Sequence, residues 1–290
     1  MGEMDTSNMM QRTRAENASF VIAAVKALGI EQPPEWRLMQ MHRVLNKPTG
    51  IIEPDNPDFD TALEAERDLQ LLGFVFDQSN AHDDHSSFQS LVKRMLIDSV
   101  LPQGNLVQSK GRDAQFELFV AAICQSAGLV PIDYEEPDVT CTISGIKFGI
   151  AAKRVKNVSN LRNRVKKAAQ QIETAQLPGI VALDTCVALN RDNERILTPM
   201  PDDQFAQLYK QALTRFLDEY HRKICHWVDG KGVRGVVFHD HQVRFEPNGQ
   251  WGLSSMTVWL PTAHDDEQAN REFSSFKESY LKGLPNLEYL

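Results

Sequence analysis

Apolar positions in the first hundred residues recur every three or four residues, the spacing that places them on one face of an α-helix. The segment 17–28 shows this pattern and ends at Gly29, a residue suited to the left-handed conformation that often closes a helix. Nothing in this part alternates apolar and polar positions as a strand does. The pattern therefore predicts a helical N-terminal region, residues 1–108, with further helices at about 33–45, 60–74 and 87–101.

The pattern changes after the turn-forming residues 102–105. A helix is predicted over 112–127, followed by three short β-branched-rich segments with alternating apolar positions. A second helix and a strongly apolar strand come next. This order predicts an α/β protein whose C-terminal domain, residues 109–290, has an αβββαβ core with a mixed central sheet. The strands are expected at 129–134, 139–143, 146–152 and 180–188, the helix at 161–175, and beyond them a helix at 203–227, strands at 235–245 and 251–260, and a helix at 267–284.

Three charged residues of this domain fall where the predicted elements would bring them together. Glu117 lies in the middle of the first helix, Asp138 opens the second strand, and Lys153 ends the third. A turn at Gly145 makes the last two strands an antiparallel hairpin, in which the start of one strand faces the end of the next. We therefore expect Asp138 and Lys153 to be neighbours at one edge of the sheet.

A carboxylate beside a lysine suits the hydrolysis of a phosphodiester. Carboxylate oxygens bind hard divalent cations, and Mg²⁺ takes oxygen ligands in an octahedral arrangement with several waters retained. Such a cation polarises the phosphate and lowers the pKa of a bound water. The lysine can position that water or stabilise charge on the phosphorus, and Glu117 could supply a second carboxylate. We expect Asp138, Glu117 and Lys153 to be catalytic, with Mg²⁺ or Mn²⁺ as cofactor.

Residues 112–188 resemble the core of the PD-(D/E)xK nuclease superfamily, the fold of many restriction enzymes and Holliday-junction resolvases. The resemblance is carried by the helix with Glu117, the pair Pro137-Asp138, Lys153 and the long helix that follows. It covers about a quarter of the chain. It implies a restriction-endonuclease-like fold in which Asp138 binds the metal and Lys153 assists the attacking water.

The sequence departs from that family at one position. Ala151 stands two residues before Lys153, where the family's ExK triplet has a metal-binding glutamate. The resemblance implies two sources for the missing oxygen: Glu117 from its helix, or the backbone carbonyl of Ala152. Some family members also carry a glutamine on the helix after the lysine.

Two adjacent glutamines are candidates for that last position. The apolar stripe of the predicted helix runs from Leu161 to Ile172 at helical spacing. Gln171 lies on the flank of this stripe, whereas Gln170 points away from it. We therefore expect Gln171 to support the site.

A run of positive charge favours a polyanionic ligand independently of any family. Positions 153 to 167 contain seven basic residues and no acidic one, in a chain with a net charge of −8. Contacts of this kind supply most of the non-specific affinity for nucleic acids and make it sensitive to salt. DNA is favoured over RNA because the resembling families mostly cut DNA. We expect the nucleic-acid backbone to be held by Arg154, Lys156, Arg162, Arg164 and Lys167.

Composition limits the classes of protein to which the chain can belong. With 42% hydrophobic and 24% charged residues the chain is typical of a globular protein. No apolar run approaches the roughly 20 residues that cross a bilayer, and no secretory signal is recognisable, so we expect a cytoplasmic protein without a membrane partner. Four widely spaced cysteines argue against a disulfide framework. The following histidines match no zinc-ligand spacing and are expected on the surface or in the core: His82, His85, His221, His226, His239 and His241.

These observations favour a metal-dependent endonuclease, and two other classes stay open. The first is a catalytically inactive protein of the nuclease fold that binds nucleic acid or a partner protein. The second is a protein–protein adaptor whose N-terminal helices carry the function. The resemblance also implies a role in bacterial restriction or antiviral defence, and leaves a second copy of the chain or a regulatory protein open as partner.

Overall fold

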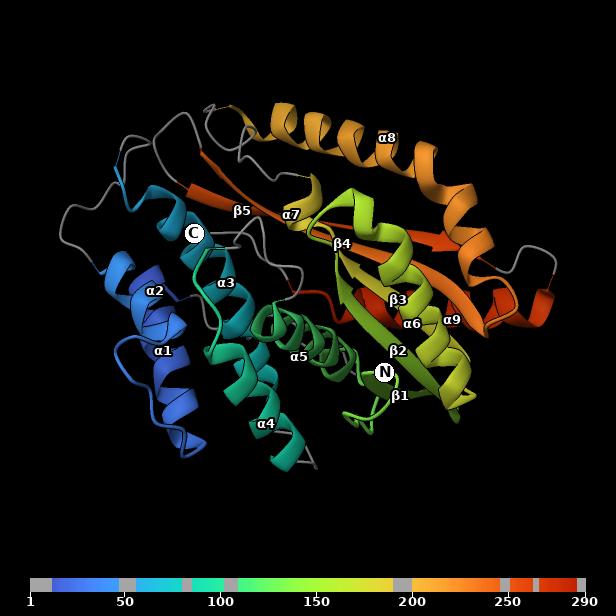
Figure 1. Cartoon of the computed structure of the whole chain (residues 1–290), viewed down its shortest axis with the longest axis horizontal. Helices are drawn as coiled ribbons and strands as arrows, with labels where there is room; N and C mark the ends of the chain where they lie inside the picture. Colours follow the sequence, from blue (N-terminus) through green and yellow to red (C-terminus); the bar gives the residue numbers. More distant parts are fainter. Residues whose placement is uncertain are drawn as a thin grey trace, which may run out of the picture.

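The computed structural model describes residues 12–46, 56–79, 85–101, 109–189, 200–245, 251–262 and 266–285. Within these ranges the chain forms an α/β protein with nine α-helices and five strands in one open, mixed sheet (Figure 1). None of the described helices is both long and apolar enough to span a membrane. The turn predicted at 102–105, His82 and the side chain of His85 lie outside the described residues.

The helical N-terminal region has the four helices that the apolar pattern predicts. The longest of them, α3, extends beyond its predicted range at both ends and packs against α1 and α2 as well as against the first helix of the C-terminal region (Figure 1). The four helices are α1 (Arg14–Ala27), α2 (Arg37–Leu45), α3 (Phe59–Gln78) and α4 (His85–Leu96).

The sheet has its strands side by side in chain order. β1 (Val139–Ile143) is antiparallel to β2 (Ile146–Arg154), and β2, β3 (Gly179–Asp184) and β4 (Val233–Phe245) are parallel. β5 (Trp251–Pro261) is antiparallel to β4. Parallel neighbours need crossover connections, and helices supply them here. The helices of this region are α5 (Lys110–Ser126), α6 (Leu161–Ala175), the short α7 (Cys186–Leu189), α8 (Asp202–Val228) and α9 (Glu267–Lys282).

Alternate residues along the strands face two different helix layers. Ile150 and Ala152 belong to one apolar cluster together with residues of α5 and α9, whereas Ala151 packs in a second cluster with α6 and α8. In Figure 1, α6 and α8 lie in front of the sheet and α9 lies behind it. This two-sided burial explains why the central strands are apolar at successive positions.

Two of the predicted strands differ from the structure. The segment 129–134 forms only an isolated bridge, Asp133 with Thr140, because Pro131 lacks the N–H that a continuous ladder needs. The strand predicted at 180–188 ends at Asp184, whose carboxylate accepts a hydrogen bond from the N–H of Cys186 (3.0 Å) and starts the short α7. The order around the site is therefore α5, β1, β2, α6, β3, and the αβββαβ prediction contained one strand too many.

One apolar core extends across the predicted domain boundary. Val21, Leu69 and Met95 of the N-terminal helices lie in the same buried cluster as Phe119 of α5 and Ile150 of β2. The boundary itself, between residues 108 and 109, adjoins a stretch outside the described residues. The N-terminal helices therefore pack on the sheet-bearing region through a shared core.

Charged side chains are also buried where α3 and α5 meet the carboxyl ends of the parallel strands. Arg112 of α5, 1% exposed, donates to Glu64 (3.0 Å) and lies 3.1 Å from Asp68. Burial alone would raise the pKa of Asp184, but Arg154 beside it (2.5 Å) lowers that pKa to about 2. Removing one partner of such a buried pair costs about 3–5 kcal/mol, so these contacts hold α5 against α3 and β2 against β3.

Two buried histidines make the stability of the fold depend on pH. Burial lowers the pKa of His239 to about 3 and that of His241 to about 4. Both ring nitrogens of His241 lack a hydrogen-bond partner within the described residues. Because the unfolded chain takes up these protons near pH 6.5 and the folded chain does not, stability falls as the pH drops below about 6.5.

Replacing His241 with leucine should reduce this acid sensitivity. Between pH 7 and pH 5 we expect the variant to lose about 2 kcal/mol less unfolding free energy than the wild type, because one buried group no longer resists protonation. Denaturant titrations at the two pH values measure the difference. His226→Leu, at an exposed position, is the matched control. Identical pH dependence in wild type and His241→Leu would contradict this account.

Candidate active site

A cavity of about 340 Å³ lies at the β1 edge of the sheet, between α5 and α6. It contains side chains from both helices, from the start of β1, from the end of β2 and from α4. Ten residues line it: Arg94, Lys110, Asp113, Glu117, Asp138, Ala152, Lys153, Arg164, Lys167 and Gln171.

Asp138 and Lys153 meet in this cavity. β1 pairs with β2 so that Val139 faces Ile150, which places the preceding Asp138 opposite Ala151 and next to Ala152. Oδ2 of Asp138 accepts a hydrogen bond from the N–H of Ala152 (2.8 Å) and forms an ion pair with the buried ammonium of Lys153. The pKa of Asp138 is raised because burial outweighs the effects of Lys153 and the other donors. The juxtaposition predicted from the hairpin is therefore present.

Gln171 holds Asp138 from the other side. Its Nε2 donates to the carbonyl of Pro137 (2.6 Å) and to Oδ1 of Asp138 (3.2 Å). Its Oε1 is buried and has no hydrogen-bond partner within the described residues. Gln170 points away and accepts from Lys231 (3.3 Å). Of the two glutamines, the structure brings to Asp138 the one that the apolar stripe favours.

Glu117 faces the same cavity from the middle of α5. Its carboxylate accepts a hydrogen bond from Arg94 of α4 (2.5 Å), and its side chain is 15% exposed. Burial, together with the nearby negative charge of Asp138, raises the pKa of Glu117 to about 7, although Arg94 and Lys153 act in the opposite direction. The cavity thus holds two carboxylates that interact electrostatically.

The donor set fits a hard divalent cation better than zinc. Within the described ranges no three Asp, Glu, His or Cys side chains come together as a metal cage. Mg²⁺ is commonly bound by one or two carboxylates plus water, and Asp138, Glu117 and the unpartnered Oε1 of Gln171 are oxygen donors of that kind. Ala152 also lines the cavity, whereas Ala151 is fully buried in the apolar cluster beneath α6 and offers no side-chain ligand.

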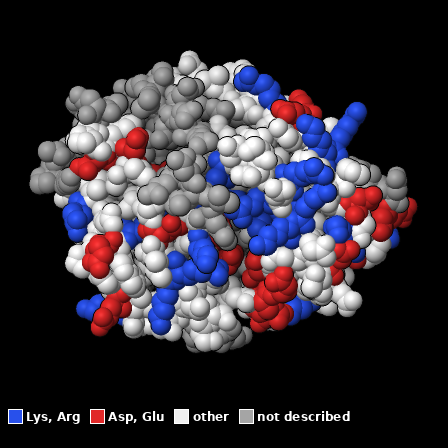
Figure 2. Space-filling view, viewed as in Figure 1, with Lys and Arg blue, Asp and Glu red and all other residues white. Residues whose placement is uncertain are grey.

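Of the five predicted phosphate-binding residues, four lie at the cavity or on the surface and one, Arg154, is buried. Arg164 and Lys167 line the cavity, Arg162 is exposed, and Lys156 is partly exposed. Figure 2 shows basic side chains gathered over α6. Arg154 differs from the other predicted residues: β2 continues to this position, and its side chain is buried against Asp184 (2.5 Å), which argues against a contact with nucleic acid.

Three lining residues were not predicted from the sequence. Asp113 lies one helical turn before Glu117, a spacing that places both on one face of α5 and could have identified it. Burial raises the pKa of Asp113, and Arg164 lies 4.0 Å away. Lys110 is the first residue of α5, whereas Arg94 reaches the cavity only because α4 packs on α5, a tertiary contact with no sequence signal.

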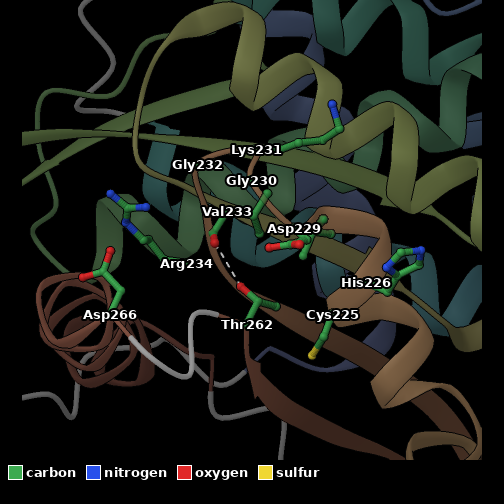
Figure 3. Close-up of a pocket in the computed structure, with 11 residues that line it drawn as sticks. Cys225, His226, Asp229, Gly230, Lys231, Gly232, Val233, Arg234, Thr262 and Asp266 are labelled. Atoms are coloured by element: carbon green, nitrogen blue, oxygen red, sulfur yellow. Dashed lines mark hydrogen bonds between the residues drawn. The ribbon is translucent and has the colours of Figure 1, made fainter.

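A larger cavity, of about 670 Å³, lies where α8 ends and β4 begins (Figure 3). Three of its polar side chains are already paired. Lys231 reaches toward the neighbouring helix and bonds Glu173 (2.6 Å), Arg234 bonds Glu272 (2.5 Å), and the hydroxyl of Thr262 donates to the carbonyl of Val233 (2.9 Å). Size alone therefore does not indicate function here.

Comparisons with known proteins do not identify the chain. No protein-family model matches it, and a search of curated proteins also finds no match. Any functional assignment therefore depends on the chemistry of the cavity.

Glu117→Gln should stabilise the metal-free protein at high pH. The Glu117 carboxyl has a higher pKa folded (about 7) than unfolded (about 4.5), so wild-type stability falls as the pH rises through this window. Glutamine does not ionise, so the unfolding free energy of the variant should be about 3 kcal/mol higher than that of the wild type at pH 8. The difference should vanish at pH 4, where the wild-type carboxyl is protonated in both states. Denaturant titrations in EDTA test this, and a variant less stable than wild type at pH 8 would contradict the burial of an unfavourable charge.

Proposed function

We propose that this protein is a metal-dependent nuclease that hydrolyses nucleic-acid phosphodiester bonds, with DNA as the favoured substrate. The observation that carries the proposal is the Asp138–Lys153 pair, held by Gln171 and facing Glu117 in one cavity. A restriction-endonuclease-like arrangement of the sheet and its helices is part of the same proposal. So is a cytoplasmic location, and so is a role in restriction or antiviral defence, which follows only from the resemblance of residues 112–188.

Asp138 and Glu117 would hold the cation, with Gln171 or the carbonyl of Ala152 as a further oxygen donor. When bound, Mg²⁺ or Mn²⁺ polarises the phosphate and lowers the pKa of a water. In hydrolysis the water oxygen bonds to phosphorus, one ester P–O bond breaks, and the products are a phosphate monoester and a hydroxyl group. Lys153 carries an ammonium within reach of Asp138, where it can orient the water and stabilise negative charge on the phosphoryl oxygens.

The basic rim of the cavity suits the substrate. Arg164 and Lys167 of α6 face the cavity, and Arg162 and Lys156 extend the positive surface beside it. Such residues hold the sugar–phosphate backbone without reading its sequence. Binding should weaken steeply as salt rises, because each phosphate contact releases counterions. An adaptor that acts through its N-terminal helices would show no such dependence.

A second function, binding without cleavage, is favoured by one observation. Ala151 is 0% exposed within an apolar cluster, so the position that carries a metal ligand in the resembling family serves here as core. A protein of this kind would keep the basic surface and bind nucleic acid or a partner protein. Cleavage assays separate it from the nuclease.

The nuclease should nick or linearise a supercoiled plasmid in Mg²⁺ or Mn²⁺ and not in EDTA. Asp138→Asn is expected to lower the rate at least about a hundredfold, because several kcal/mol of barrier reduction depend on the cation. Lys153→Met should have a comparable effect. Gln171→Ala should cost about 10–100-fold, as loss of a group that orients a ligand usually does.

Gln170→Ala is the matched control, since its amide lies one residue away and does not contact Asp138. It should cut like the wild type. Cutting that survives Asp138→Asn would exclude the proposed site. Salt-sensitive binding with no cutting in either metal would support the inactive nuclease-fold protein instead.

A further inference from the structure

An arginine of the N-terminal helices lies in the candidate active site. Arg94 of α4 donates from Nη2 to Oε2 of Glu117 at 2.5 Å, and both side chains line the cavity that contains Asp138. The Arg94 side chain is 45% exposed, against 15% for Glu117. A guanidinium has five N–H donors in a planar fork. Much of that donor capacity therefore faces the cavity and solvent.

The backbone that carries Arg94 is fixed against α5. A Cβ atom built on Gly111 would come within 2.7 Å of Cβ of Asp98 and 3.0 Å of the Arg94 carbonyl oxygen, so only glycine allows this close approach. Asp98 also accepts hydrogen bonds from the hydroxyl of Ser109 and the N–H of Arg112 (3.2 Å) at the start of α5. These contacts hold the Arg94 backbone close to α5, and the long, partly exposed Arg94 side chain is the part with room to move.

Arg94 and a divalent cation would compete for the same carboxylate. In the metal-free protein the guanidinium balances the charge of Glu117, which burial and Asp138 make unfavourable. A cation on Glu117 would repel the guanidinium, whose fork geometry then matches a phosphate group. Arg164 and Lys167 line the same cavity from α6, so a phosphate that enters it would meet positive groups from two helices.

We propose that Arg94 is a phosphate-contacting residue of this active site, which holds Glu117 in the metal-free protein and transfers to a substrate phosphate when a divalent cation takes that carboxylate. The inference rests on the proposed nuclease function and deepens it, because it makes the N-terminal helices part of the substrate-binding machinery.

Two measurements on Arg94→Ala test this role. Titration calorimetry with Mn²⁺ alone should show affinity up to about fivefold tighter than wild type, the size of an exposed ion pair, because the competing guanidinium is gone. Plasmid cleavage at saturating Mn²⁺ should fall about tenfold or more in kcat/KM, as expected for a lost charge-assisted hydrogen bond. Arg94→Lys should lie between, because lysine keeps the charge and loses the fork.

Lys93→Ala is the matched control. Lys93 is the exposed neighbour of Arg94 on α4, and its replacement should leave both measurements at wild-type values. Equal cutting by Arg94→Ala and wild type, or Mn²⁺ affinity that Arg94→Ala leaves unchanged or weakens, would overturn the role of Arg94 while the nuclease stands. A wild type that neither binds Mn²⁺ nor cuts would refute the proposed function, and the role of Arg94 with it.

Discussion

Val139 pairs with Ile150 across β1 and β2, and the other features of the site depend on that register. It places Asp138 against the N–H of Ala152 and the ammonium of Lys153. A slip of one residue would turn each side chain of β1 to the opposite face. The two helix layers on the sheet then bring their polar groups to the same edge, α5 from one side and α6 from the other. The cavity is thus a consequence of how the sheet ends.

The fold was largely predictable because most of its elements have a local signal. The helix at 161–175 and the strand at 139–143 match their predicted ranges, since helical spacing and β-branched alternation are properties of contiguous residues. The strand predicted at 129–134 is absent because Pro131 has no N–H to donate to a ladder, and the alternation of apolar positions takes no account of that missing donor. The shared core between N-terminal helices and sheet had no local signal, because it joins segments far apart in the chain.

The residues of the candidate site also differ in whether a local sequence signal places them. Asp138 and Gln171 could be placed from hairpin geometry and helix periodicity, both of which act over short stretches. The burial of Arg154 could not be predicted in this way, because it depends on Asp184, which follows thirty residues later on another strand. Arg94 also could not, because it reaches the cavity through the packing of α4 on α5. Charges in a basic run look alike in sequence until the fold separates buried from exposed ones.

The account rests on Asp138 and Glu117 sharing one divalent cation. Crystals grown or soaked with Mn²⁺, measured at a wavelength where manganese scatters anomalously, test this directly. We predict an anomalous peak in the cavity between α5 and α6, within coordination distance of a carboxylate oxygen from each residue. No peak in that cavity, or a peak that contacts neither carboxylate, would contradict the account.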